Sequence, residues 1–223
     1  MLMQTVTDLD ALITRQTGDK KHEASATSTL DVLLVLYEHV LRVDPADPAW
    51  EGRDRFLLSK GHGPMAFYAV LARAGFFPLE DLDRFLHWDG RLGAHPDRLQ
   101  VPGVEVSTGS LGHGLPMAVG VAYALRSKGL RDQRVVVLTG DAELNEGSNW
   151  EAILHAGSAG LDNLTLVVVD NRSSSVELGD IAGKVATFGW DTVTVGGRDH
   201  DELRAALSAR PGRPNAVVAV IDE

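Results

Sequence analysis

The sequence predicts an α/β protein with a doubly wound, mostly parallel sheet flanked by helices. Residues 134–139 and 164–170 form two short runs rich in β-branched residues, each bounded by turn residues. Their continuous apolar character is typical of central parallel strands that are covered on both faces. Segments with helical periodicity separate the strand candidates, and this alternation of strands and helices indicates a parallel sheet.

The other elements follow from the same patterns. Two more strands are expected at 191–195 and 216–221, and helices at 146–160 and 200–209. The first half of the chain is predicted to be mainly helical, because apolar residues recur there at helix spacing. The helices expected in it are 28–41, 64–74 and 115–127.

Length and composition favour a single domain over residues 1–223. With 223 residues, 44% of them hydrophobic, the chain can bury a substantial core. A net charge of −10 argues against a general nucleic-acid binder, which needs basic surface. The absence of Cys excludes disulfides, thiolate metal sites and a cysteine nucleophile. Residues 1–16 lack the layout of a signal peptide, and we expect a cytoplasmic protein without a membrane span.

Polar residues follow two neighbouring strands of the predicted sheet. Asp141 comes directly after the first strand, and Asn171 follows the second. Ligands of open parallel sheets bind beyond the carboxyl ends of the strands, where helix N-termini favour phosphate. An Asp carboxylate and an Asn amide oxygen suit Mg²⁺ or Ca²⁺. From the residues alone, a helix cap at Asp141 and a turn at Asn171 explain the pattern equally well.

A set of segments resembles the transketolase family of thiamine diphosphate enzymes. Gly140-Asp141-Ala142 followed by Asn171 resembles the family's cofactor signature, which is Gly-Asp-Gly and a later Asn. Further segments resemble transketolases in particular, and they stand in the family's order between about residues 10 and 221. These segments are 53–63, 94–96, 102–114, 146–147, 188–190 and 197–200.

The resemblance implies thiamine diphosphate and Mg²⁺ as cofactors, with Ca²⁺ as a substitute for Mg²⁺. Asp141, the Asn171 side chain and the main-chain carbonyl of Ser173 would hold the metal ion, which would bridge the diphosphate oxygens. The residues expected to contact the cofactor are His62, Gly109, Leu111, Gly140, Asp141, Ala142 and Asn171.

Four residues are expected to serve the chemistry. The resemblance implies that His62 approaches the diphosphate and that His95 meets a hydroxyl of the donor near the reacting carbon. It assigns His22 to the substrate, and it places Glu146 in a carboxylate network at a subunit contact. Histidine suits proton transfer because its pKa lies near working pH.

The expected reaction moves a two-carbon ketol unit from a ketose, or ketose phosphate, to an aldose. In the resembled family, a glutamate and aromatic side chains beside the aminopyrimidine come from a second, pyrimidine-binding domain. The chain ends at Glu223, where full-length relatives continue into that domain. We therefore expect an N-terminal subunit that needs a partner carrying the pyrimidine-binding domain, in an α2β2 assembly. A truncated longer chain is the competing explanation.

Several positions depart from the family pattern. Ala142 replaces the glycine after the metal-binding Asp, and its methyl group would either crowd the diphosphate or be tolerated if its φ is negative. Lys21 and Glu23 flank His22 where the family prefers Gly and Pro, and Ser173 replaces an aliphatic residue. Two other readings stay open. One is another thiamine enzyme, such as a 2-oxoacid dehydrogenase first component or a deoxyxylulose-phosphate-synthase-like protein. The other is a non-catalytic partner or regulatory subunit.

Overall fold

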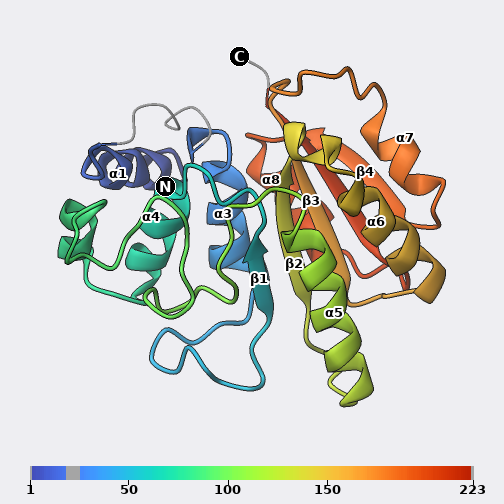
Figure 1. Cartoon of the computed structure of the whole chain (residues 1–223), viewed down its shortest axis with the longest axis horizontal. Helices are drawn as coiled ribbons and strands as arrows, with labels where there is room; N and C mark the ends of the chain where they lie inside the picture. Colours follow the sequence, from blue (N-terminus) through green and yellow to red (C-terminus); the bar gives the residue numbers. More distant parts are fainter. Residues whose placement is uncertain (1, 19–25, 222–223) are drawn as a thin grey trace.

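A five-stranded, fully parallel sheet forms the centre of the protein. The computed structural model describes residues 2–18 and 26–221. In these residues the strand order is β1-β2-β3-β5-β4, and each neighbouring pair is parallel (Figure 1). The predicted α/β fold is confirmed. The strands are β1 (Arg55–Leu58), β2 (Val135–Gly140), β3 (Leu164–Asp170), β4 (Asp191–Gly196) and β5 (Asn215–Val220).

Helices cover both faces of the sheet, as a doubly wound fold requires. Figure 1 shows the two helical layers on opposite sides of the strands. One layer contains α1 (Leu2–Thr14), α3 (Leu30–Val35), α4 (Met65–Ala74) and α8 (His200–Ser208). The other contains α5 (Gly114–Ser127), α6 (Gly147–Ala159) and α7 (Ile181–Ala186). Over the described residues, each helix is too short or too polar to traverse a lipid bilayer.

Alternation along the central strands creates two hydrophobic cores. Successive side chains of a strand point to opposite faces of the sheet. In β2, Val135 and Val137 face the core under α5 and α6, whereas Val136 and Leu138 face the core under α3 and α4. All four are fully buried. The continuous apolar run that predicted a central strand is therefore explained by burial on both sides.

Three elements are absent from the sequence-based expectations: β1, α1 and α7. β1 is a four-residue strand without β-branched residues, so its sequence carries little strand signal. α7 spans six residues, too few for helical periodicity to be visible. The expected helix 28–41 is divided, because α3 passes into a π-helical segment at Leu36–Val40.

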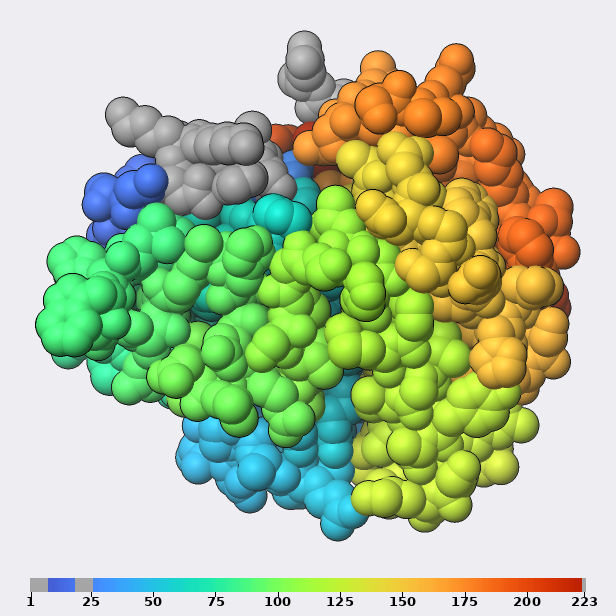
Figure 2. Space-filling model, viewed as in Figure 1, coloured from blue at the N-terminus to red at the C-terminus, as the bar shows by residue number. Residues whose placement is uncertain are grey.

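The long segment between α4 and α5 has little regular structure. It contains one 3₁₀ helix, Leu79–Arg84, and otherwise turns and loops. In the space-filling view this segment, in green, spreads over the face of the molecule between the N-terminal helices and α5 (Figure 2). It carries His95 and Gly109 to the neighbourhood of the strand ends.

Candidate functional site

The carboxyl ends of β1, β2 and β3 bring distant polar residues to one edge of the sheet. Because these neighbouring strands are parallel, their ends point in the same direction. Ser59 and Lys60 follow β1, Asp141 follows β2, and Asn171 follows β3. This arrangement places the predicted metal-binding residues at the edge where open α/β sheets bind ligands.

Asp141 is buried and tied to the loop after β3. Only 1% of this residue is exposed. Its Oδ1 accepts a hydrogen bond from Ser173 Oγ at 2.7 Å, and its Oδ2 accepts one from the Ser174 main-chain N–H at 2.9 Å. Asp141 and Ser173, which the sequence analysis assigned to one metal site, therefore lie in contact. The contact uses the Ser173 hydroxyl, while the expected metal ligand is its carbonyl.

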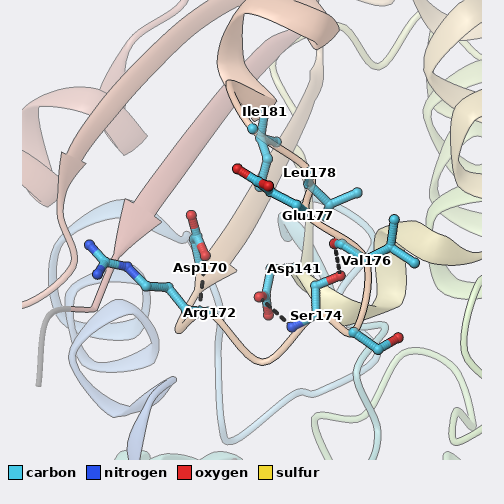
Figure 3. A pocket seen from close by; sticks show the side chains of 10 residues that line it. Asp141, Asp170, Arg172, Ser174, Val176, Glu177, Leu178 and Ile181 are labelled. Atoms are coloured by element: carbon cyan, nitrogen blue, oxygen red, sulfur yellow. Dashed lines mark hydrogen bonds between the residues drawn. The ribbon is translucent and has the colours of Figure 1, made fainter.

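A cavity of about 490 Å³ opens beside Asp141. Figure 3 shows the carboxylates of Asp141, Asp170 and Glu177 around this space, and Arg172 departing from the loop after β3. Asp170 Oδ1 accepts a hydrogen bond from the Arg172 main-chain N–H, at 3.1 Å. Three carboxylates thus make the lining of this cavity acidic.

Asn171 lies half-buried between Asp170 and the loop that contacts Asp141. Nowhere in the described part of the chain do three or more His, Cys, Asp or Glu side chains gather in a way that could hold a metal ion. The oxygens available here come from one buried carboxylate, an amide and main-chain carbonyls. Such hard oxygen donors suit Mg²⁺, which often keeps water and phosphate oxygens as its other ligands.

His62 and His95 meet at the same edge of the sheet. Their ring centroids are 5.0 Å apart, and the rings are nearly perpendicular, with an interplanar angle of 81°. His62 lies four residues after the end of β1, whereas His95 lies in the long segment between α4 and α5. The structure thus brings these two predicted site residues into contact, while their expected roles at the diphosphate and at the donor hydroxyl stay predictions.

Two glycines allow the backbone to pass close to this pair. A Cβ atom at Gly109 would lie 2.6 Å from His95 Cδ2, and the Gly109 φ of +148° is rare for other residues. A Cβ atom at Gly61 would lie 2.8 Å from the main-chain nitrogen of Gly109. Any side chain at either position would push the two loops apart, so the sequence keeps a close backbone approach here.

Glu143 is a buried carboxylate that the sequence analysis did not identify. Only 2% of the residue is exposed. Its Oε1 accepts hydrogen bonds from Ser59 Oγ, at 2.5 Å, and from the Gly112 main-chain N–H, at 3.0 Å. Burial raises the pKa of Glu143, while the hydrogen bonds from Ser59, Gly112 and Gly140 and the charge of Lys60 oppose this shift.

Lys60 is a second buried charge that the sequence analysis missed. Its aliphatic part packs beside Gly140, where a Cβ would lie 3.5 Å from Lys60 Cδ. Its Nζ donates to Ser28 Oγ over 3.3 Å. Burial lowers the pKa of Lys60 to about 8, against the attraction of Asp141 and Glu143. The signal available in the sequence was that Lys60 lies in segment 53–63, which resembles transketolases.

For four predicted site residues, the structure gives only their position or no information. Glu146 is exposed and precedes α6 as its N-cap residue, so its place in an intersubunit network stays a prediction. The carbonyl of Leu111 pairs with the His113 ring at 3.0 Å. Ala142 begins a 3₁₀ turn and is not among the residues with positive φ, so its methyl group causes no backbone strain. His22 lies outside the described residues.

The edge as a whole suits a diphosphate bound through a divalent cation. It offers hard oxygens at Asp141 and Asn171, and the cation Lys60 lies beneath Gly140. The glycine-rich loop 109–114 leads directly into the N-terminus of α5, and main-chain N–H groups at such a position favour phosphate. Two histidines stand beside this loop and can exchange protons with a bound substrate.

Sequence comparison finds a family and relatives for this chain. Residues 5–218 match the family described as "Transketolase, thiamine diphosphate binding domain". A protein of Rhodococcoides fascians named ferredoxin fas2 is 51% identical over 218 residues, covering 96% of this chain and 71% of that protein. A subunit of the apulose-4-phosphate transketolase of Actinobacillus succinogenes is 38% identical over 210 residues, covering 89% of this chain and 75% of the relative.

Structural comparison gives the same result. The transketolase of Leishmania mexicana superposes with a TM-score of 0.80 at 28% sequence identity. The match covers 96% of this chain but 36% of that transketolase. The chain therefore spans about a third of the length of that solved enzyme, and it shares the fold of one part of it.

Proposed function

The chain belongs to the transketolase family through its thiamine diphosphate binding domain, and from this premise we propose that it is the metal- and diphosphate-binding subunit of a two-subunit ketol transferase. The observation that carries the proposal is the meeting of Asp141, Asn171 and the two histidines at one sheet edge. No single sequence motif contains all four residues, because they come from four separate segments.

Asp141 and Asn171, with the carbonyl of Ser173, would hold Mg²⁺. The contact between Asp141 and Ser173 supports this set, because it brings the loop after β3 to the carboxylate. The main-chain groups of Gly109 and Ala142 would face the diphosphate, and Lys60 would supply positive charge beneath it. When bound, thiamine diphosphate supplies the nucleophilic carbon and the electron sink for cleaving a carbon–carbon bond of a ketose.

His95 would handle protons at the donor hydroxyl next to that bond, and His62 would approach the diphosphate. Their rings are in edge-to-face contact, so the His62 ring can help to position the His95 ring while His95 accepts or returns a proton at a ring nitrogen. His22 would join them from the segment outside the described residues, and Glu146 would act at the subunit contact. These roles rest on the resemblance and on the placement of His62 and His95 together.

A partner subunit carrying the pyrimidine-binding domain would complete the active site. The relative from Actinobacillus succinogenes is named as one subunit of a transketolase, and this chain covers 75% of it, which supports a division of the enzyme into two polypeptides. An α2β2 assembly and a cytoplasmic location stay predictions.

The substrate would be a sugar or sugar phosphate. The name of that same relative, which specifies apulose 4-phosphate, supports a specialised ketose phosphate as readily as a common pentose phosphate. The name of the Rhodococcoides relative refers to an iron–sulfur protein. Iron–sulfur clusters are held by cysteine thiolates, and this sequence contains no Cys, so we do not carry that function to this chain.

Calorimetric titration with thiamine diphosphate and Mg²⁺ tests the proposal. The titration would use this chain mixed with the proposed partner polypeptide that carries the pyrimidine-binding domain. We expect saturable binding of one cofactor per copy of this chain, abolished by EDTA. No binding by the mixture would contradict the proposal and favour a non-catalytic subunit that keeps only the fold.

A further inference from the structure

We propose that Glu143 is a positioning residue, which holds the loop after β1 and the loop before α5 against the end of β2 and thereby shapes the diphosphate cradle. This inference rests on the proposed function, because it names a determinant of the same site. Glu143 does not belong to the expected metal ligands or to the expected catalytic residues.

Glu143 connects three segments that are far apart in the sequence. Ser59 Oγ, at the end of β1, and the Gly112 N–H, before α5, both donate to its Oε1. The main chain of Gly140, at the end of β2, stabilises the same carboxylate. One side chain therefore fixes the relative positions of three segments at this edge of the sheet, beside which a diphosphate would lie.

The two residues that donate to Glu143 lie close in the sequence to expected site residues. Ser59 lies three residues before His62, and Gly112 lies three residues after Gly109. The loop before α5 is also held from α6, where Ser148 Oγ donates to the Gly112 carbonyl at 2.6 Å. A shift of the Glu143 carboxylate would therefore move the loop that carries His62 and the loop in which Gly109 packs against His95.

Packing around Glu143 leaves no room for the loops to adjust. A Cβ atom at Gly114 would lie 2.3 Å from Ser59 Oγ, and one at Gly112 would lie 2.6 Å from Glu146 Cβ. The Asn149 side chain donates to the Glu143 carbonyl at 2.7 Å, which fixes the main chain that carries the carboxylate. The carboxylate is thus held from its own backbone as well as by its donors.

Stability alone does not explain why a carboxylate is buried at position 143. A buried carboxylate costs free energy, and an apolar side chain of similar size is often as stable or more stable at such a site. The second oxygen, Oε2, is buried without a hydrogen-bond partner among the described residues. Lys60 compensates part of the charge through space. A carboxylate that is only partly compensated, yet binds three loops, is expected where loop position matters for function.

The substitution Glu143→Gln tests the role at nearly constant volume, because it removes the charge but keeps one acceptor oxygen. Two quantities would be measured. The first is hydrogen–deuterium exchange of amides in 59–63 and 108–113 of this chain. The second is the Kd for thiamine diphosphate, with Mg²⁺, in the mixture with the pyrimidine-domain polypeptide. We expect exchange in both loops to accelerate at least tenfold and the Kd to rise at least tenfold.

Asp54→Asn is the matched control. Asp54 is also a buried carboxylate that joins separate segments, since it accepts from the main-chain N–H groups of Arg42, at 2.9 Å, and Arg134, at 2.8 Å. It precedes β1 and so lies at the opposite edge of the sheet. We expect this variant to lose stability while its cofactor Kd stays within threefold of the wild-type value.

Several results would decide the matter. Unchanged loop exchange and unchanged Kd in Glu143→Gln would overturn the positioning role, as would an equal loss of affinity in Asp54→Asn. If the wild-type mixture binds no cofactor, the proposed function fails, and loop exchange in Glu143→Gln still shows whether the carboxylate holds the loops. If Glu143→Gln does not fold, Ser59→Ala removes one of its donors and is judged by the same two measurements.

Discussion

The imidazole rings of His62 and His95 lie edge to face with their centroids 5.0 Å apart, although their positions differ by 33 in the sequence (95 − 62). The first ring is positioned by the end of β1, and the second by the long segment between α4 and α5. Gly109 permits this contact, because a Cβ atom there would collide with the His95 ring. The pair therefore depends on three segments that only the fold brings together.

His95→Ala is expected to lower kcat for ketol transfer about 100-fold or more, the usual contribution of a group that transfers a proton. The Kd for thiamine diphosphate should change less than threefold, because His95 would face the substrate. Steady-state kinetics and calorimetry on the assembled enzyme measure the two quantities. His155→Ala is the control, since His155 is exposed on α6 and contacts Tyr123. Equal losses in the two variants would contradict the assignment.

Asp141→Asn is expected to weaken Mg²⁺-dependent binding of thiamine diphosphate at least 100-fold. The amide is a poor ligand for Mg²⁺ compared with a carboxylate, and the site also loses a negative charge. Asp170→Asn serves as the comparison, because Asp170 lines the same cavity but is not an expected ligand. Its affinity should stay within threefold of the wild type. If both variants bind the cofactor normally, Asp141 is not the metal ligand.

Lys60 should make the stability of the protein depend on pH. Burial lowers its pKa to about 8 from an ordinary value of 10.5. Between these two values the unfolded chain binds a proton that the folded protein lacks, so the free energy of unfolding rises with pH in this window. We expect Lys60 to contribute a rise of about 1–3 kcal/mol. Its contribution then levels off above the ordinary pKa, where both states are deprotonated.

Urea unfolding of the wild type and of Lys60→Met, measured from pH 7.5 to 10.5, isolates this contribution, since other titrating groups are common to both proteins. At low pH in this range, the free energy of unfolding should be larger for Lys60→Met than for the wild type. This difference should shrink as the pH rises. A difference that is independent of pH would show that Lys60 keeps its ordinary pKa in the folded protein.

Gly157→Ala should destabilise the fold by about 3 kcal/mol, the upper end of the usual cost of overpacking. A Cβ atom at Gly157 would lie 1.9 Å from the Phe188 carbonyl oxygen, so α6 would be forced away from its neighbour. Gly120→Ala, in α5, meets nothing within 4 Å and should stabilise the protein by about 0.5–1 kcal/mol. Thermal and urea unfolding compare the two. Equal effects would contradict the packing at Gly157.

The sequence was sufficient to predict the parts of the fold and site that depend on local patterns. β2 and β3 are continuous apolar runs, and the residues after them, Asp141 and Asn171, therefore had to share one edge of a parallel sheet. β1 could not be predicted in this way, because Arg55–Leu58 is short and lacks a run of β-branched residues.

The buried charges were not predictable from local patterns. Glu143 and Lys60 stand in segments where a charged residue normally lies at the surface. Their burial depends on loops contributed by β1 and by the residues before α5, which lie 31 or more positions from Glu143. The sequence also could not show that Ser173 contacts Asp141 through its hydroxyl, because this depends on the path of the loop after β3.

The central claim is that this chain supplies the metal- and diphosphate-binding half of a two-subunit ketol transferase. Its most direct test is ketol transfer from xylulose 5-phosphate to ribose 5-phosphate, with Mg²⁺ and thiamine diphosphate. This chain alone would be compared with this chain plus the proposed partner that carries the pyrimidine-binding domain. We predict activity only in the mixture. Activity of this chain alone would contradict the account, because no second domain would then be needed.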